Sequence, residues 1–145
     1  MRARPLDELV GARLLERRRV GRSHVRKLVA RAERDLGLAR DVLAPIDEER
    51  AMTLAYEAGF RACLGLLALA GYRVRSQPGH HRGALEGAAA VLGPERLPLL
   101  TRLDHARDFR NASLYEGARP LGTGELAQLL RDVSDLIGQV QRRLR

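Results

Sequence analysis

The residues best suited to chemistry lie together near the end of a predicted helix, in the run Arg110–Tyr115. Leu103, Ala106 and Arg110 recur at spacings of three and four, which places Arg110 on the apolar stripe of that helix. A guanidinium is costly to bury alone, so Arg110 must reach a carboxylate, backbone carbonyls, a phosphate or a subunit boundary. Asn111 and Tyr115 add an amide and a hydroxyl, and the three side chains could bind a phosphodiester. A structural arginine–carboxylate pair explains the same residues equally well.

The spacing within this run constrains how the side chains could meet. Five residues correspond to about 140° of rotation around a continuous α-helix, so Arg110 and Tyr115 share a face poorly. They can converge if the helix ends at Ala112–Ser113, or if two subunits contribute to one site. Both routes suit a composite cleft in a dimer.

Two adjacent histidines, His80 and His81, are expected at the start of a short helix. Adjacent side chains on a helix diverge, and no nearby cysteine or carboxylate completes a ligand set, so we predict no metal site and no cofactor. The histidines could instead cap the helix start or contact a phosphate beside Arg73 and Arg75.

The charge of the chain is strongly positive and unevenly distributed. The 145 residues include 26 Lys and Arg against 18 Asp and Glu, a net charge of +8, and residues 1–44 alone carry a net charge of +6. Arginine pairs with phosphate in a bidentate manner, which favours a polyanionic partner, although a solvated basic surface is the plainer explanation. The low aromatic content argues against the base-stacking surfaces of typical single-strand binders. The candidate phosphate-binding residues are Arg18, Arg19, Arg22, Arg73, Arg75, His80, His81 and Arg107.

Several other classes of protein are disfavoured. The sequence contains no phosphate-binding P-loop, zinc-protease, EF-hand or nucleophile-elbow motif. Cys63 is the single cysteine, which excludes an internal disulfide framework, and it lies in an apolar stripe that predicts a core position. No segment reaches the roughly 18 uncharged apolar residues of a membrane span. The first residues do not form a signal-peptide core, so we expect a cytoplasmic protein with no membrane partner.

The elements that must position these residues are all predicted to be helical. Apolar residues recur at helical spacing, whereas β-branched and aromatic residues are scarce. We expect Ser23 to cap the second helix and Thr123 the last. The acidic residues Asp47, Glu48 and Glu49 suit the positive end of the third helix, and Gly71 suits its C-cap. The predicted helices cover residues 6–18, 23–43, 47–70, 80–92, 95–112 and 123–144, with loops at 72–79 and 113–122.

This pattern predicts one all-α domain over residues 1–145. Four main helices with one or two short extra helices would form an antiparallel bundle, since short loops favour antiparallel neighbours. The third helix is apolar nearly all round from Leu64 to Ala70, so we expect it to be the central helix. Gly59 and Ala55 would let a neighbouring helix approach it closely.

The chain resembles the HEPN-domain family of small prokaryotic helical bundles. The family is marked by an Arg-x4-6-His motif near the start of the loop before the last helix, and Arg110 to Tyr115 is an Arg-x4-Tyr version. Residues 54–62, and residues 71–75 followed by 79–81, resemble the family's pattern around the third helix. Helix order and loop placement agree over residues 10–143.

The resemblance implies a metal-independent endoribonuclease that dimerises so that the two motif arginines line one cleft. Several members are toxins whose antitoxin is a small nucleotidyltransferase, and others act in phage defence. By this analogy Arg110 would hold the scissile phosphate, Asn111 would orient it, and Tyr115 would replace the histidine. Tyrosine, with a reference pKa of about 10, is a weak base at neutral pH, so the replacement favours phosphate binding over cleavage.

Three functions therefore remain open from the sequence. The first is a homodimeric HEPN ribonuclease of the toxin–antitoxin or phage-defence type. The second is a non-catalytic HEPN module that binds nucleotide, RNA or a partner protein. The third is a helical regulator, including a helix-turn-helix DNA binder, for which the basic helix start at residues 22–26 is the only indication.

Overall fold

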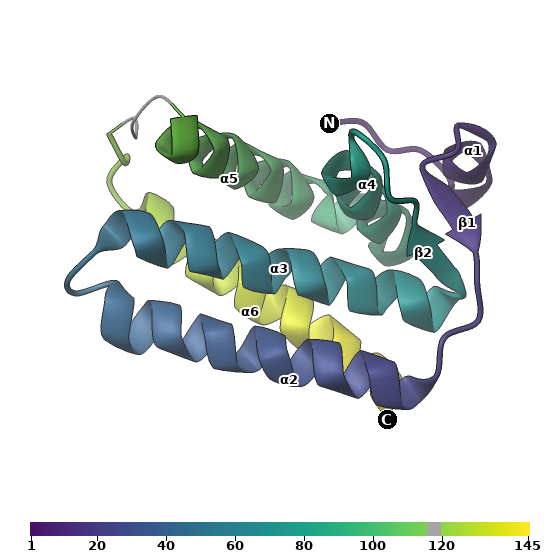
Figure 1. The fold of residues 1–145 in the computed structure, drawn as a ribbon, viewed down its shortest axis with the longest axis horizontal. Helices are drawn as coiled ribbons and strands as arrows, with labels where there is room; N and C mark the ends of the chain where they lie inside the picture. Colours follow the sequence, from purple (N-terminus) through teal and green to yellow (C-terminus); the bar gives the residue numbers. More distant parts are fainter. Residues whose placement is uncertain (116–119) are drawn as a thin grey trace.

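The computed structural model describes the backbone of residues 1–115 and 120–145, and the side chains of residues 1–110 and 120–145. The described chain is mostly helical with one small antiparallel sheet, in agreement with the predicted all-α class (Figure 1). In chain order the elements are α1 (Leu6–Gly11), β1 (Leu15–Arg17), α2 (Arg22–Leu38), a π-helical turn (Ala39–Leu43), α3 (Glu48–Ala70), β2 (Tyr72–Val74), α4 (His80–Leu92), a 3-10 turn (Pro94–Arg96), α5 (Leu97–Tyr115) and α6 (Glu125–Leu144).

Helix α3 is the centre of the fold, as the sequence predicts. Its start is fixed by Asp47, whose carboxylate accepts a hydrogen bond from the Arg50 backbone N–H at 3.1 Å. Its end is fixed by Gly71, which adopts the left-handed conformation with φ of 91°. Twelve of its residues are buried, because α2, α4, α5 and α6 all pack against it (Figure 1). This apolar helix also has the length and mean hydropathy, 1.3, of a membrane span, and 61% of that window is buried inside the protein.

A glycine on α3 lets two other helices approach closely. A Cβ atom at Gly59 would lie 3.0 Å from side-chain carbons of Leu103 on α5 and of Val133 on α6. Those distances are shorter than normal van der Waals contacts, so only glycine fits without displacing either helix. The predicted close approach at Gly59 is therefore confirmed.

The first predicted helix is wrong in its second half. Helix α1 ends at Gly11 rather than near Arg18, and Arg13 adopts a φ of 61° before the chain enters β1. Strand β1 pairs antiparallel with β2, with Leu15 opposite Val74 and Arg17 opposite Tyr72. The pairing buries Leu15, which joins Leu9 and Leu67 in a small cluster beside the main core, and this packing overrides local helix propensity. The same pairing converts the first three residues of the predicted loop 72–79 into a strand.

Two predicted helix caps are also wrong. Helix α2 begins at Arg22 after Gly21, with no side-chain cap from Ser23. Helix α6 begins after Gly124, which has a φ of 76°, and no cap from Thr123 is formed. At the start of α6 the left-handed Gly124 supplies the turn into the helix, whereas Gly21 has ordinary extended backbone angles.

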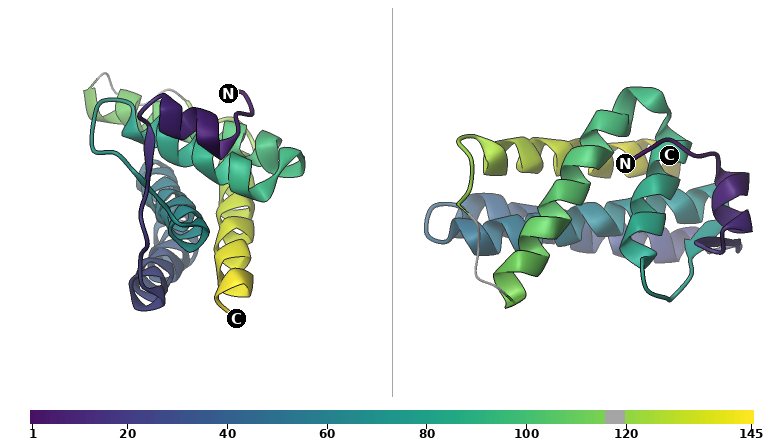
Figure 2. Two further views of the ribbon diagram at one scale, coloured as in Figure 1. Left: turned by 90° about the vertical axis from the view of Figure 1, so that its right-hand side faces the viewer. Right: turned by 90° about the horizontal axis from the view of Figure 1, so that it is seen from above.

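The long helices form two groups. Helices α2, α3 and α6 lie side by side, and α2 runs antiparallel to α3, whereas α4 and α5 cross over α3 at a steep angle (Figure 2). Seen from above, the start of α4 and the end of α5 come to the same side of α3 (Figure 2). This crossing brings His81 within range of the charge of Arg110, although about 30 residues separate them in the sequence.

Candidate functional site

Arg110 lies where α5 crosses α3. Its side chain is 28% exposed, and its Nε lies 3.8 Å from the Glu57 Oε1 on α3, beyond hydrogen-bond distance. That Nε atom is fully buried and has no hydrogen-bond partner among the described residues. The expected carboxylate is therefore present but does not saturate the guanidinium. The buried Nε is out of reach of solvent, so it is the exposed part of the guanidinium that can bind an anion from solvent.

An imidazole and a phenol form the neighbouring part of the site. Tyr56, fully buried on α3, makes a 2.7 Å hydrogen bond through its hydroxyl to the His81 Nδ1 at the start of α4. The ring of Phe60 packs against His81 with centroids 4.4 Å apart, and the two histidine rings lie 4.2 Å apart. Three rings from two helices, those of Tyr56, Phe60 and His80, therefore hold His81 in one orientation.

The environment keeps His81 neutral at physiological pH. Burial, followed by the charges of His80, Arg110 and Arg107, lowers the pKa of His81 to about 4. Burial also raises the pKa of Tyr56, so its hydroxyl stays protonated. The charges of Arg107 and Arg110 act on His81 through space. A neutral imidazole beside a fixed cation is an arrangement that can accept a proton near a bound anion.

The remaining residues of the predicted motif cannot be placed in the same detail. The side chains of Asn111 and Tyr115 lie outside the described residues. Helix α5 extends to Tyr115, so the predicted helix end at Ala112–Ser113 is wrong. Positions 110 and 115 therefore lie about 140° apart around one helix axis. The two positions therefore do not converge within this helix, and a contribution from a second subunit stays a prediction.

Arg107 is more heavily neutralised than Arg110. Its Nε donates to Asp104 at 3.1 Å, and its Nη2 lies 3.5 Å from the Asp108 carboxylate. Two carboxylates of its own helix thus compete with any phosphate for this guanidinium. Among the two arginines of α5 near His81, Arg110 is the better candidate for anion binding.

The other predicted phosphate-binding arginines gather at the opposite end of α3. Arg22 donates to the backbone carbonyls of Arg143 and Leu144, which end α6, so part of its hydrogen-bonding capacity is structural. Arg73 pairs with Glu16 across the two strands. Arg18 and Arg19 are exposed, and neither has an ion-pair partner among the described residues. Arg75 is likewise exposed, in the loop before α4.

The sequence analysis missed three residues of α3 at this site: Tyr56, Glu57 and Phe60. Tyr56 and Phe60 follow the apolar spacing of α3, which identifies them only as core residues. Phe60 is partly exposed, and its ring packs against the two histidines at the surface. The only signal in the sequence is the hydroxyl of Tyr56, which lies in a stripe that otherwise consists of apolar residues. A buried hydroxyl needs a partner, and here that partner is His81.

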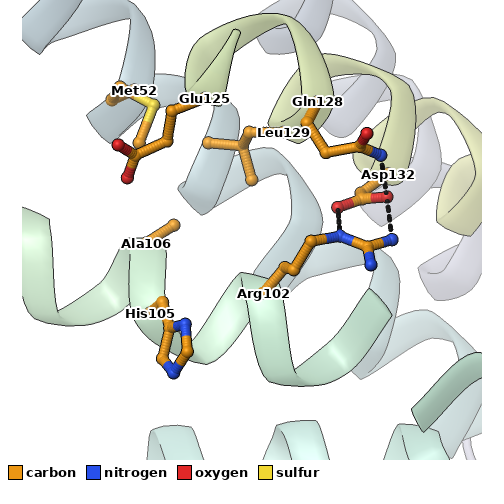
Figure 3. Close-up of a pocket in the computed structure, with 8 residues that line it drawn as sticks. All are labelled: Met52, Arg102, His105, Ala106, Glu125, Gln128, Leu129 and Asp132. Carbon is orange, nitrogen blue, oxygen red and sulfur yellow. Dashed lines mark hydrogen bonds and ion pairs between the residues drawn. The ribbon is translucent and has the colours of Figure 1, made fainter. Parts of the chain in front are cut away.

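Apart from the site around Arg110, a cavity of about 250 Å³ lies between α3, α5 and α6 (Figure 3). Its apolar surface comes from Met52, Ala106 and Leu129. On one side Arg102 donates two 2.8 Å hydrogen bonds to the buried Asp132 carboxylate. Gln128 donates a third hydrogen bond to the same carboxylate, at 3.0 Å, so the polar groups on this side satisfy one another (Figure 3). Unlike Arg110, these groups leave no buried donor unused.

Comparisons of the chain with family models, with curated proteins and with solved structures give no match. Within the described part of the chain, no three histidine, cysteine, aspartate or glutamate side chains are grouped closely enough to hold a metal ion.

Proposed function

We propose that this protein is a HEPN-like endoribonuclease that cleaves RNA without a metal ion and acts as a homodimer. The observation that supports it best is that the charge of Arg110, whose buried Nε has no partner among the described residues, acts on a neutral His81 that is held by Tyr56. The family motif has a histidine where this chain has Tyr115. His81 supplies an imidazole from a different helix, beside the same arginine.

The groups at this site match the steps of RNA cleavage. In the proposed reaction the ribose 2′-oxygen attacks the adjacent phosphorus, the bond from phosphorus to the 5′-oxygen breaks, and a 2′,3′-cyclic phosphate forms. Neutral His81 accepts the 2′-hydroxyl proton, and the phosphate charge raises its proton affinity as the substrate binds. Arg110 donates to the non-bridging oxygens, where negative charge increases in the transition state. Tyr115, by the family analogy, donates a proton to the leaving 5′-oxygen.

The test is incubation of the purified protein with RNA in the presence of EDTA. We expect cleavage to products that end in a 2′,3′-cyclic phosphate. Arg110→Ala should reduce the rate by roughly 100- to 1,000-fold, the usual effect of removing a group that stabilises transition-state charge. Arg34→Ala removes an exposed arginine elsewhere and is the matched control. Intact RNA, or cleavage that Arg110→Ala leaves unchanged, would refute the proposal.

His81 has its own variant. His81→Gln places an amide, which can still hydrogen-bond, near Tyr56 and removes the imidazole that accepts the proton. The cleavage rate should therefore fall by about 100-fold or more. RNA affinity should change little, because the arginines remain. A rate that is unaffected by His81→Gln would assign the base to another residue.

The dimer is a separate part of the proposal. With α5 continuous to Tyr115, a second subunit is needed to bring the tyrosine of one chain to the arginine of the other. Light scattering should therefore give twice the 16.1 kDa of the chain at micromolar concentration. A small nucleotidyltransferase encoded next to this gene would support the toxin–antitoxin version.

The alternative of a non-catalytic HEPN module is favoured by one observation, the tyrosine at position 115. This alternative predicts RNA binding that weakens with salt and depends on Arg110, without turnover. The EDTA assay and a parallel gel shift separate the two functions. A gel shift with duplex DNA tests the regulator hypothesis in the same series.

A further inference from the structure

We infer that one face of α3 carries a binding track for single-stranded RNA, with Arg110 at one end and Arg18 and Arg19 at the other. The inference rests on the proposed function for the cleavage end, and it adds the length and class of the substrate. It starts from a groove of about 490 Å³ beside the connection from β1 to α2. The residues that line this groove are Arg18, Arg19, Val20, Gly21, His24, Leu28, Leu64, Ala68, Tyr72, Arg73 and Val74.

The groove has the charge of an anion-binding surface. Arg18 and Arg19 project into solvent without ion-pair partners among the described residues, and Arg73 is only partly neutralised by the half-exposed Glu16. Helix α2 begins beside the groove at Gly21 with no side-chain cap and no acidic residue in its first turn. The positive end of the helix dipole therefore adds to the arginine charges rather than being cancelled. A phosphate backbone is the ligand that best matches this set.

The groove and the Arg110 site lie on the same face of α3. Leu64 and Ala68 line the groove, and Glu57 contacts Arg110. Positions 64 and 68 each fall within about 20° of position 57 around the helix, on either side of it, because seven and eleven residues are close to two and three turns. At 1.5 Å per residue, the two sites are separated by about 10 to 16 Å along the helix axis. One strand lying along α3 can therefore reach both.

The surface between the two sites suits nucleotides rather than a protein segment. Phe60, whose position on α3 falls between those of Glu57 and Leu64, and His80 at the start of α4 have partly exposed rings 6.1 Å apart, on which bases can stack. The chain from Arg73 in β2, through Arg75, to His80 at the start of α4 forms one edge of this region. Arginines therefore border the path from the groove to the histidines. A single strand, with its bases free to stack, fits this arrangement better than a duplex.

The inference predicts that binding depends on strand length. A dinucleotide has one phosphodiester and can occupy only the Arg110 site, whereas an oligonucleotide of about ten residues can reach the groove. The test compares Arg18→Ala/Arg19→Ala with the control Arg34→Ala/Arg131→Ala, which removes the same charge from exposed positions that do not line the groove. The probe is a fluorescent 2′-O-methyl oligouridylate, which lacks the 2′-hydroxyl proton and is not cleaved. Affinity is measured by anisotropy.

We expect the groove variant to bind the long probe roughly tenfold more weakly at moderate salt, the effect of losing two exposed phosphate contacts. Between about 50 and 200 mM salt, its affinity should fall roughly sevenfold less than that of the parent, given a slope of about 0.7 per contact. Binding of the dinucleotide and the behaviour of the control should be unchanged. If RNA is cleaved, the groove variant should raise KM for long substrates and leave kcat intact.

The outcomes distinguish a failure of the RNA-binding track from a failure of the proposed catalysis. Length-dependent binding that the groove variant abolishes supports the track even if no RNA is cleaved, and in that case only the proposed catalysis fails. Cleavage with identical length dependence in the parent, groove and control proteins overturns the track and leaves the proposed function standing. Tighter binding of a duplex of the same length than of the single strand would also overturn the track.

Discussion

Protonation of His81 should destabilise the folded protein, and the size of the effect follows from its surroundings. The pKa of His81 is lowered from 6.5 to about 4 in the folded chain. Between these two pH values the unfolded chain binds a proton at this residue and the folded chain does not. Stability therefore rises with pH across this interval and is lost as the pH falls from about 6.5 towards 4.

The magnitude is limited by the partial exposure of the ring. The gap between 6.5 and about 4 corresponds to roughly 3 kcal/mol at about 1.36 kcal/mol per pH unit. Water reaches part of His81 and screens its interaction with the two arginines, so we expect about 1 to 2 kcal/mol in practice. The remaining acid sensitivity of the protein comes from its carboxylates.

The assay compares urea unfolding of the parent protein and of His81→Gln from pH 7 to pH 4.5. Glutamine does not titrate, so only the parent loses this contribution. The free energy of unfolding of the parent, relative to that of His81→Gln, should fall by about 1 to 2 kcal/mol as the pH falls. His24→Gln, at an exposed histidine of α2, is the control and should follow the parent. NMR titration of the His81 ring should give a pKa near 4 that increases in Arg110→Ala. A pKa near 6.5 that Arg110→Ala leaves unchanged would refute the description of the site.

Three further predictions test the fold. Phe109→Ala should cost roughly 3–5 kcal/mol in urea unfolding, because the ring is fully buried between the helices, and a loss below about 1 kcal/mol would contradict that packing. Asp47→Ala should cost about 1 kcal/mol by removing the cap of α3, whereas Asp47→Asn should recover most of it. Burial raises the pKa of the Cys63 thiol to about 12, so iodoacetamide should label it at pH 8 only after unfolding. Rapid labelling of the native protein would show that α3 is not the central helix.

Most of the helices could be predicted from the sequence because their signals are local. Asp47 and Gly71 mark the ends of α3 through their own side chain and backbone preferences, and both are confirmed. The end of α1 could not be predicted in this way. Leu15 leaves the helical pattern because it pairs and packs with residues about 60 positions later in the chain. No local pattern carries that information.

The candidate site shows the same division. Helical spacing alone identifies Arg110 as a buried cation that needs a partner, and one of the possible partners, a carboxylate, is found in Glu57. The relation of Arg110 to His81 depends on the steep crossing of α4 and α5 over α3, which the spacing of apolar residues does not specify (Figure 2). The sequence analysis identified both residues as phosphate ligands and could not show that they belong to one site.

The pairing of β1 with β2 also determines the order in which the parts of the molecule can assemble during synthesis. Strand β1 emerges from the ribosome early, but its partner residues, Tyr72 to Val74, follow more than 50 residues later. Until then Leu15 has neither its strand partner nor Leu67 to cover it. A nascent chain halted before β2 therefore exposes this strand, and a chaperone that binds unpaired apolar strands should recognise it only during that interval.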